Sequence, residues 1–130
     1  MTKRMRDVLL GLTFVMTVVI GFLAPAYAES KSFNVTLGPF FEDVTVTSGT
    51  KSYGSGAALI CVYSTSPNGG HFWITKDGSQ CSTSVTVGIG QTKGSSYNSS
   101  SSSGTVVLHA HQIYWGGGTD TCKGYVNFNN

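Results

Sequence analysis

The sequence predicts an all-β protein, a single small antiparallel β-sandwich of about seven strands, with a small β-barrel as the alternative. Three observations support this fold class. Serine, threonine, glycine and asparagine make up about half of the residues after Ala28. The apolar residues in this part recur in short alternating runs, not at the 3.6-residue spacing of an amphipathic helix. Residues that favour turns separate the runs, and each run has the length of a strand.

Residues 1–28 are predicted to be a secretory signal peptide that is cleaved after Ala28. Three basic residues lie within the first six positions, and an uncharged apolar run follows from Val8 to Ala24. Pro25 and the small residues Ala26 and Ala28 then match the frame of a cleavage site. An uncleaved membrane anchor is the alternative interpretation. Residues 29–130 are therefore expected to form one secreted, extracytoplasmic β domain.

Loss of the signal peptide changes the charge of the protein. The whole chain has a formal net charge of +2, but residues 29–130 contain equal numbers of lysines and acidic residues, and no arginine. Nucleic-acid binding depends on basic patches, and cationic peptides depend on attraction to anionic lipid. The neutral domain is therefore expected to bind neither nucleic acid nor a membrane through charge.

Seven runs are predicted as strands: residues 33–37, 41–47, 57–64, 71–76, 82–90, 105–114 and 123–128. Asn68-Gly69 and Asp77-Gly78 supply the positive φ angles of tight turns, so residues 57–90 are predicted to form a three-stranded meander. Residues 91–104 include five consecutive serines and are predicted to form a flexible loop.

Three cysteines lie in the exported part, where disulfides form and persist. Cys61 belongs to an apolar run, whereas Cys81 and Cys122 have polar, turn-like neighbours. We therefore predict a disulfide between Cys81 and Cys122, although the other two pairings remain open. The third thiol would then be a small buried side chain.

Strand alternation predicts which side chains share a face. In residues 71–75, Phe72 and Ile74 are expected to face the core, and in residues 105–111 the same is expected of Val106, Leu108 and Ala110. If the two strands belong to one sheet, the alternate residues form a surface of aromatic and imidazole rings suited to stacking on sugars. The candidate ligand-binding residues are His71, Trp73, His109, His111 and Trp115.

The histidines also raise the question of a metal. His109 and His111 are two residues apart, so on a strand they lie on one face about 7 Å apart, and His71 is the third histidine of the chain. These three residues are the candidate zinc ligands of a metal-dependent hydrolase. No Gly-x-Ser-x-Gly motif is present, and the adjacent Glu42 and Asp43 would point to opposite faces of a strand, unlike the paired carboxylates of a glycosidase.

These patterns favour a non-enzymatic secreted binding module that recognises a glycan or a cell-envelope component. Residues 84–90 and 105–111 share the alternating composition of hairpins that enter membranes, so a secreted toxin or antimicrobial protein is one alternative function. The histidine-ligated hydrolase is the other.

Overall fold

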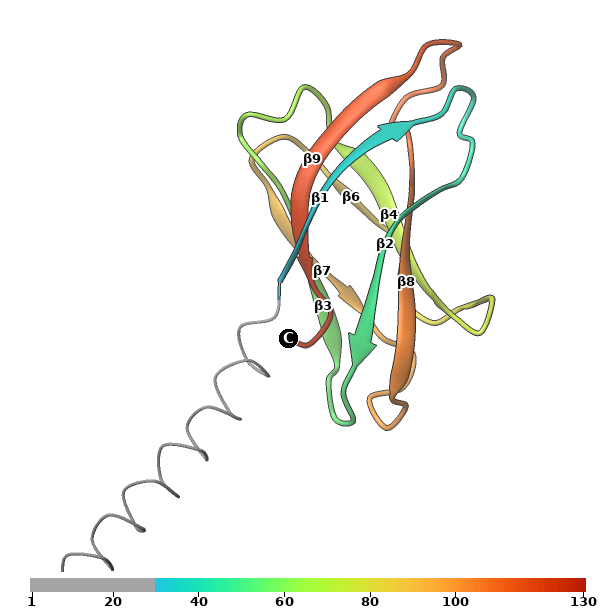
Figure 1. Ribbon diagram of the computed structural model, residues 1–130, viewed down its shortest axis with the longest axis vertical. Coiled ribbons are helices and arrows are strands. Elements are labelled where there is room, and N and C mark those ends of the chain that lie inside the picture. Colours follow the sequence, from blue (N-terminus) through green and yellow to red (C-terminus); the bar gives the residue numbers. More distant parts are fainter. Residues whose placement is uncertain (1–29) are drawn as a thin grey trace, which may run out of the picture.

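The computed structural model describes residues 30–130, and the predicted signal peptide with its cleavage site lies outside them. The described residues form two antiparallel sheets, which confirms the all-β sandwich (Figure 1). Between residues 30 and 130 there is no helix long and apolar enough to cross a membrane. The strands are β1 (Lys31–Leu37), β2 (Val44–Lys51), β3 (Ala57–Val62), β4 (Gly70–Lys76), β5 (Ser79–Gln80), β6 (Val85–Val87), β7 (Thr92–Ser96), β8 (Gly104–His111) and β9 (Asp120–Asn127).

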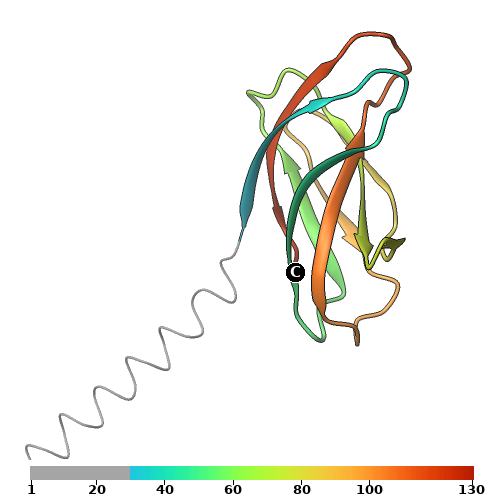
Figure 2. The ribbon, with the colours of Figure 1, turned by 45° about the vertical axis from the view of Figure 1, so that its right-hand side comes forward.

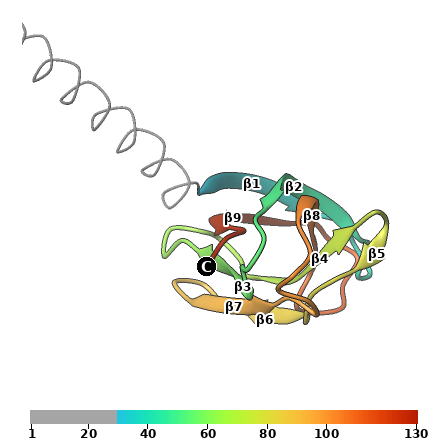
Figure 3. The ribbon, with the colours of Figure 1, turned by 90° about the horizontal axis from the view of Figure 1, so that it is seen from below.

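The two sheets pack face to face and enclose the core. One sheet has the order β1-β9-β3-β7, and the other has the order β2-β8-β4-β5 with β6 also paired to β4. The end-on view in Figure 3 shows the two layers, with β1, β9, β3 and β7 around one side and β2, β8 and β4 around the other. The chain crosses repeatedly between the layers, so each sheet combines strands that are distant in the sequence.

The core side chains follow the predicted alternation. Phe72 and Ile74 of β4 are fully buried, and so are Val106, Leu108 and Ala110 of β8. The opposite sheet contributes alternate residues of β1, β3 and β9, and Phe33 meets Phe72 across the interior with ring centroids 5.8 Å apart. Two pleated faces with apolar residues at every second position account for this single core.

The predicted meander is wrong in its first half. β3 pairs with β7 and β9, whereas β4 pairs with β8, β5 and β6, so β3 and β4 belong to different sheets. The segment 66–70 therefore crosses between the layers and does not close a hairpin. The Asp77-Gly78 turn is confirmed, because both residues have positive φ angles of 51° and 80° and the turn joins β4 to β5.

The prediction of a flexible loop over residues 91–104 is wrong for its first half. Thr92–Ser96 form the edge strand β7 beside β3, and the Ser95 side chain is fully buried. Its hydroxyl donates to Thr83 O at 2.6 Å, and its oxygen also lies within hydrogen-bond distance of Ser82 Oγ, at 2.8 Å. Because its buried serine is satisfied by hydrogen bonds, this segment forms a strand although it has no apolar side chain.

A buried lysine anchors the second half of the same segment. Lys51 is fully buried, and its ammonium group donates to the carbonyl oxygens of Ser52, Ser100 and Ser102 at 3.3, 3.1 and 2.5 Å. The ammonium also lies 4.9 Å from the ring centroid of Tyr97. Burial lowers the pKa of Lys51, and the three carbonyl oxygens compensate for its lost hydration.

The predicted disulfide is not formed. All three cysteines are free thiols, with Cys122 buried in the core and Cys61 and Cys81 half-buried. Cys122 pairs with Val35 near the end of β1, whereas Cys81 follows β5 and interacts with Lys51 and Lys76 at the last residues of β2 and β4. The two thiols therefore lie toward opposite ends of the sandwich. The polar residues before Cys122 belong to the start of β9 and the loop that precedes it, whereas the Cys122 side chain faces the core.

An aromatic and imidazole face on the β2-β8-β4 sheet

Four candidate residues lie together on the outer side of the β2-β8-β4 sheet. The antiparallel register places His71 of β4 opposite His111 of β8, and Trp73 opposite His109. The rings of Trp73 and His109 are stacked, with centroids 5.7 Å apart and planes at 13°. The rings of His71 and His111 are stacked at 4.7 Å and 22°. These four residues, which we call the aromatic face, share one side of one sheet as the alternation predicted.

Hydrogen bonds fix the orientation of the three imidazoles. Thr75 Oγ1 lies 2.7 Å from His109 Nε2, and Thr86 Oγ1 lies 2.8 Å from His71 Nδ1. His111 Nδ1 donates to the carbonyl oxygen of Gln112 at 2.6 Å, since a carbonyl oxygen only accepts. Burial, and secondarily the neighbouring His111, lower the pKa of His71. His71 is therefore uncharged near pH 7 where it stacks on His111.

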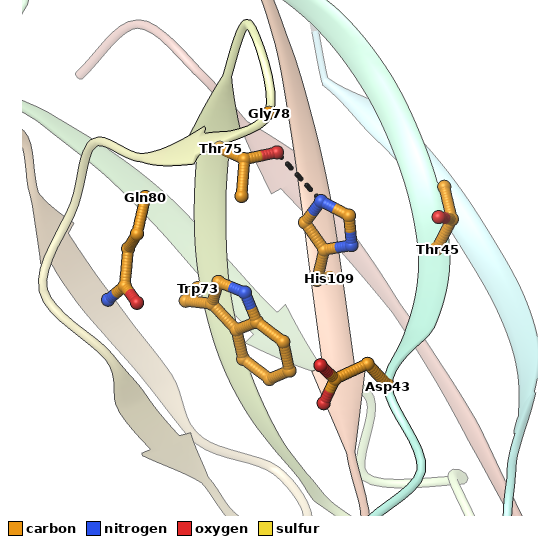
Figure 4. A pocket seen from close by; sticks show the side chains of 7 residues that line it. All are labelled: Asp43, Thr45, Trp73, Thr75, Gly78, Gln80 and His109. Atoms are coloured by element: carbon orange, nitrogen blue, oxygen red, sulfur yellow. Dashed lines mark hydrogen bonds between the residues drawn. The ribbon is translucent and has the colours of Figure 1, made fainter.

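An open pocket of about 520 Å³ adjoins the aromatic face. Trp73 and His109 form its floor, and polar side chains from three other segments surround them (Figure 4). Asp43 precedes β2 and extends its carboxylate toward the indole ring, while Gln80 belongs to β5 across the pocket. The remaining lining residues are Thr45, Thr75 and Gly78. A flat aromatic floor is thus combined with several hydrogen-bonding groups.

Trp115 joins this surface by a different route from the predicted one. β8 ends at His111, so residues 112–115 do not continue the regular alternation. Trp115 lies in the β8–β9 connection and is 67% exposed. Its ring contacts Phe41 at 5.4 Å and Phe40 at 5.0 Å, and Phe41 in turn contacts His111 at 4.8 Å. Two phenylalanines therefore link Trp115 to the aromatic face.

Phe40 and Phe41 were not identified from the sequence as site residues. Phe41 was expected to begin a strand, but the chain turns at both phenylalanines, with φ angles of 56° and 60°. Positive φ is costly for bulky side chains and is retained where the surroundings impose it. Here the backbone N–H of Phe40 donates to Gly116 O at 2.8 Å, which ties the β1–β2 loop to the β8–β9 loop. The Gly38-Pro39 pair was the one sequence signal for this turn.

The two loops lie at one end of the sandwich. In Figure 2 the β1–β2 connection and the β8–β9 connection run side by side at the top of the molecule. We call the cluster formed there by Phe40, Phe41 and Trp115 the aromatic tip. Phe40 is 54% exposed and Phe41 38% exposed, so large apolar area faces solvent at this end.

The charges around this surface are acidic. Of the five lysines between residues 30 and 130, three belong to the opposite sheet, and Lys51 and Lys76 are the last residues of β2 and β4. Glu42 and Asp43 follow the aromatic tip directly, and Asp77 lies in the β4–β5 turn beside Gly78 of the pocket. Of the residues that line the pocket, none carries a positive charge.

The three histidines are not arranged as a metal site. Within residues 30–130, no group of three histidine, cysteine, aspartate or glutamate side chains is placed to hold a metal ion. Two of the imidazoles are stacked on each other, and each of the three has a ring nitrogen engaged with a hydroxyl or carbonyl oxygen. The predicted zinc site of His71, His109 and His111 is therefore not supported by the geometry.

We compared the chain with models of protein families, with curated proteins and with solved structures, and none of the three comparisons found a match.

Proposed function

We propose that this protein is a secreted, non-enzymatic binding module that recognises a glycan on an extracellular surface or cell envelope through its aromatic face. One observation carries the proposal. The stacked Trp73 and His109 form the floor of an open pocket whose other side chains are polar. Ligand sites typically combine an apolar surface with a few well-placed polar groups.

The chemistry of the pocket suits a sugar. A pyranose ring has an apolar face of C–H groups that stacks on an indole or imidazole, and a rim of hydroxyls that forms hydrogen bonds. Among residues 30–130, the Asp43 carboxylate has no hydrogen-bond partner, and it extends toward the indole ring of Trp73. Gln80 Nε2 donates to Ser82 O and Ser84 Oγ, which orients the amide of this exposed side chain, and its Oε1 is the acceptor that a ligand could use. Both groups accept hydrogen bonds, as a polyhydroxylated ligand requires.

The same geometry favours binding over hydrolysis. Glycoside hydrolysis uses two carboxyl groups on either side of the scissile bond. Asp43 is the one carboxylate among the residues that line the pocket. The proposed role of the site is therefore recognition.

A glycan array followed by titration of tryptophan fluorescence tests this proposal. We expect wild-type protein to bind a subset of glycans, and Trp73→Ala to reduce that binding at least tenfold. Trp115→Ala is expected to weaken it less, because Trp115 is farther from the pocket. Tyr53→Ala is the matched control, since Tyr53 is an exposed aromatic residue (76%) in the β2–β3 connection. Equal binding by wild type, Trp73→Ala and Trp115→Ala would contradict the assigned site.

A second function, membrane activity of a toxin or antimicrobial protein, is favoured by the exposed aromatic tip. Phe40, Phe41 and Trp115 are exposed together with Tyr114, which is 80% exposed. Aromatic side chains of this kind are enriched at bilayer interfaces. Leakage of a dye from liposomes of zwitterionic and anionic composition measures this activity. Leakage that Phe41→Ala and Trp115→Ala abolish would support it, and intact vesicles in every composition would exclude it.

A further inference from the structure

We propose that the ligand is a linear, uncharged polysaccharide chain, bound over several consecutive sugar units along a path from the pocket to the aromatic tip. This inference rests on the proposed glycan-binding function and extends it to the class and length of the ligand. Its basis is a continuous series of rings, two preformed loops and the distribution of charge.

The rings form an unbroken series from the pocket to the end of the sandwich. Trp73 lies 5.5 Å from His111, His111 lies 4.8 Å from Phe41, and Phe41 lies 5.4 Å from Trp115. Phe40 then lies 5.0 Å from Trp115. Each distance joins two ring centroids. A pyranose is about the size of one such ring, so the series offers more stacking surface than a single sugar covers. Several connected units would use it fully.

The far end of this path is held in place before any ligand binds. Phe40 and Phe41 keep positive φ angles, and the Phe40 N–H to Gly116 O hydrogen bond joins their loop to that of Trp115. A Cβ added at Gly117 would lie 3.1 Å from the Phe40 ring, so glycine at this position allows the loop to approach the ring closely. A strained, exposed aromatic conformation that packing imposes is a feature of sites prepared for a ligand.

Charge selects the class of polysaccharide. The lining of the pocket includes no basic residue and one carboxylate, that of Asp43, while Glu42 lies between Asp43 and the aromatic tip in the sequence and Asp77 precedes Gly78 of the lining. A chain that carries carboxylate, sulfate or phosphate groups would meet like charges without a basic partner. The side chains that remain available, Asp43 and Gln80, accept hydrogen bonds. Hydroxyl groups of an uncharged polysaccharide provide the matching donors.

The experiment measures affinity as a function of chain length. The probes are linear β-1,4-linked oligomers of glucose, N-acetylglucosamine and mannose, each from one to six units long, and the readout is isothermal titration calorimetry. We expect at least one series to show affinity that rises tenfold or more from the shortest to the longest oligomers. Hyaluronan and alginate, which are linear but anionic, are expected to bind more weakly than the best neutral series.

Variants separate the two ends of the path. Phe41→Ala and Trp115→Ala are expected to remove most of the gain with chain length and to leave binding of the shortest oligomers within about twofold of wild type. Trp73→Ala should weaken all lengths. Phe41→Asn is the second variant at the tip, because asparagine tolerates positive φ and keeps the loop conformation without the ring. Tyr53→Ala is the control that should behave as wild type.

The outcomes distinguish this inference from the proposed function. Affinity that is independent of length, or is unaffected by Phe41→Asn and Trp115→Ala, would overturn the extended path while the glycan pocket stands. Tighter binding of the anionic chains would overturn the assignment of an uncharged ligand. Failure to bind any glycan, neutral or anionic, would reject the proposed function itself. Binding of the tip to phosphatidylcholine vesicles in place of the oligomers would assign the tip to membranes.

Discussion

The two outer faces of the sandwich have the same architecture and different chemistry. On the β1-β9-β3-β7 sheet, the outward positions of β1 are Ser32, Asn34 and Thr36, and those of β9 include Lys123 and Tyr125. On the β2-β8-β4 sheet, the outward positions of β4 and β8 hold the indole and the three imidazoles of the aromatic face. Both faces alternate with the core in the same way.

The difference between the faces shows what the fold requires and what it does not. A sheet face that only needs to be soluble is satisfied by small polar residues and lysine, which the outward positions of β1 and Lys123 provide, although Leu59, Cys61 and Tyr125 also point outward from β3 and β9. The second face has no lysine along its outward positions and carries stacked rings next to an open pocket. Nothing in the core behind the aromatic face calls for this arrangement, because the fully buried inward residues of β4 and β8 are Phe72, Ile74, Val106, Leu108 and Ala110, which are ordinary aliphatic and aromatic side chains. We therefore propose that the first sheet serves mainly stability and that the second serves binding.

The largest effect is expected from Gly124→Ala in the first sheet. A Cβ at Gly124 would collide with the backbone carbonyl oxygen of Cys61 in the adjacent β3 and would lie 2.9 Å from the Phe33 ring. Backbone cannot give way as a flexible side chain can, so we expect a loss of about 3 kcal/mol or more in the free energy of unfolding, measured by urea denaturation.

Gly94→Ala is the matched control for this substitution. Gly94 lies in the edge strand β7, and its Cβ would make only an ordinary contact of 3.9 Å with Ala58 O. Its free energy of unfolding should change by less than about 1 kcal/mol. Equal stability of the two alanine variants would show that β9 and β3 do not approach each other as described.

A slightly smaller effect is expected at alkaline pH, again from the first sheet. Burial raises the pKa of the Cys122 thiol from 9.0 to about 11. Between these values the unfolded chain releases the proton that the folded chain keeps, so stability falls as pH rises through this range. The two-unit shift corresponds to about 2–3 kcal/mol.

Urea denaturation at a series of pH values measures this loss. Cys122→Ala should reduce the alkaline slope without abolishing it, because burial also raises the pKa values of Cys81 and Tyr97. A slope identical to that of wild type would show that Cys122 is not buried in the folded protein.

Acidic pH is expected to lower both the stability of the protein, through His71 of the second sheet, and its affinity for the glycan. The pKa of His71 is lowered, so the unfolded chain binds a proton more readily than the folded one, and stability falls as pH drops below the ordinary histidine range. Protonation of His71 also places a charge against the ring of His111. Of the groups that face His71, Thr86 and Trp73 are uncharged.

We expect glycan affinity to fall severalfold between pH 7 and about pH 4 while circular dichroism shows that the fold persists. His71→Gln, which keeps a polar side chain without the titration at this position, should weaken the dependence. A pH dependence that this substitution leaves unchanged would assign the titration to other groups.

The smallest effect is expected from Tyr125→Ala on the outer side of the first sheet. Tyr125 packs beside Tyr63 with ring centroids 6.0 Å apart, far from the pocket and on the other layer. The substitution should cost no more than about 1 kcal/mol of stability and leave glycan affinity unchanged. Loss of binding in Tyr125→Ala would mean that the two faces do not divide the functions as assigned.

Local alternation was sufficient to predict the fold class and the four residues of the aromatic face. Phe72 and Ile74 were assigned to the core by periodicity alone, and the register then placed His71 and Trp73 on the outside. The pairing of strands could not be predicted in the same way, because a turn signal such as that of residues 66–70 shows where the chain reverses and not which sheet it enters.

The other features that the sequence did not predict also depend on contacts that form only in the folded chain. β7 contains no apolar residue, and its one buried side chain, Ser95, depends on hydrogen bonds that only the folded chain makes. The contribution of Phe40 and Phe41 depends on positive φ angles that a β-forming residue type does not signal. Trp115 was predicted to share a face with His109 and His111 by continuing their strand. In the structure it lies beyond the end of β8 and is connected to His111 through the ring of Phe41.

The central claim, that the outer side of the β2-β8-β4 sheet is the glycan-binding surface, is tested most directly by nuclear magnetic resonance. The chain contains two tryptophans, so two indole N–H signals report separately on the pocket (Trp73) and on the aromatic tip (Trp115). On titration with the longest oligomer that binds, we predict that both signals shift together with the amides of β4 and β8. Shifts that cluster around Tyr63 and Tyr125 instead, with both indole signals unmoved, would contradict the account.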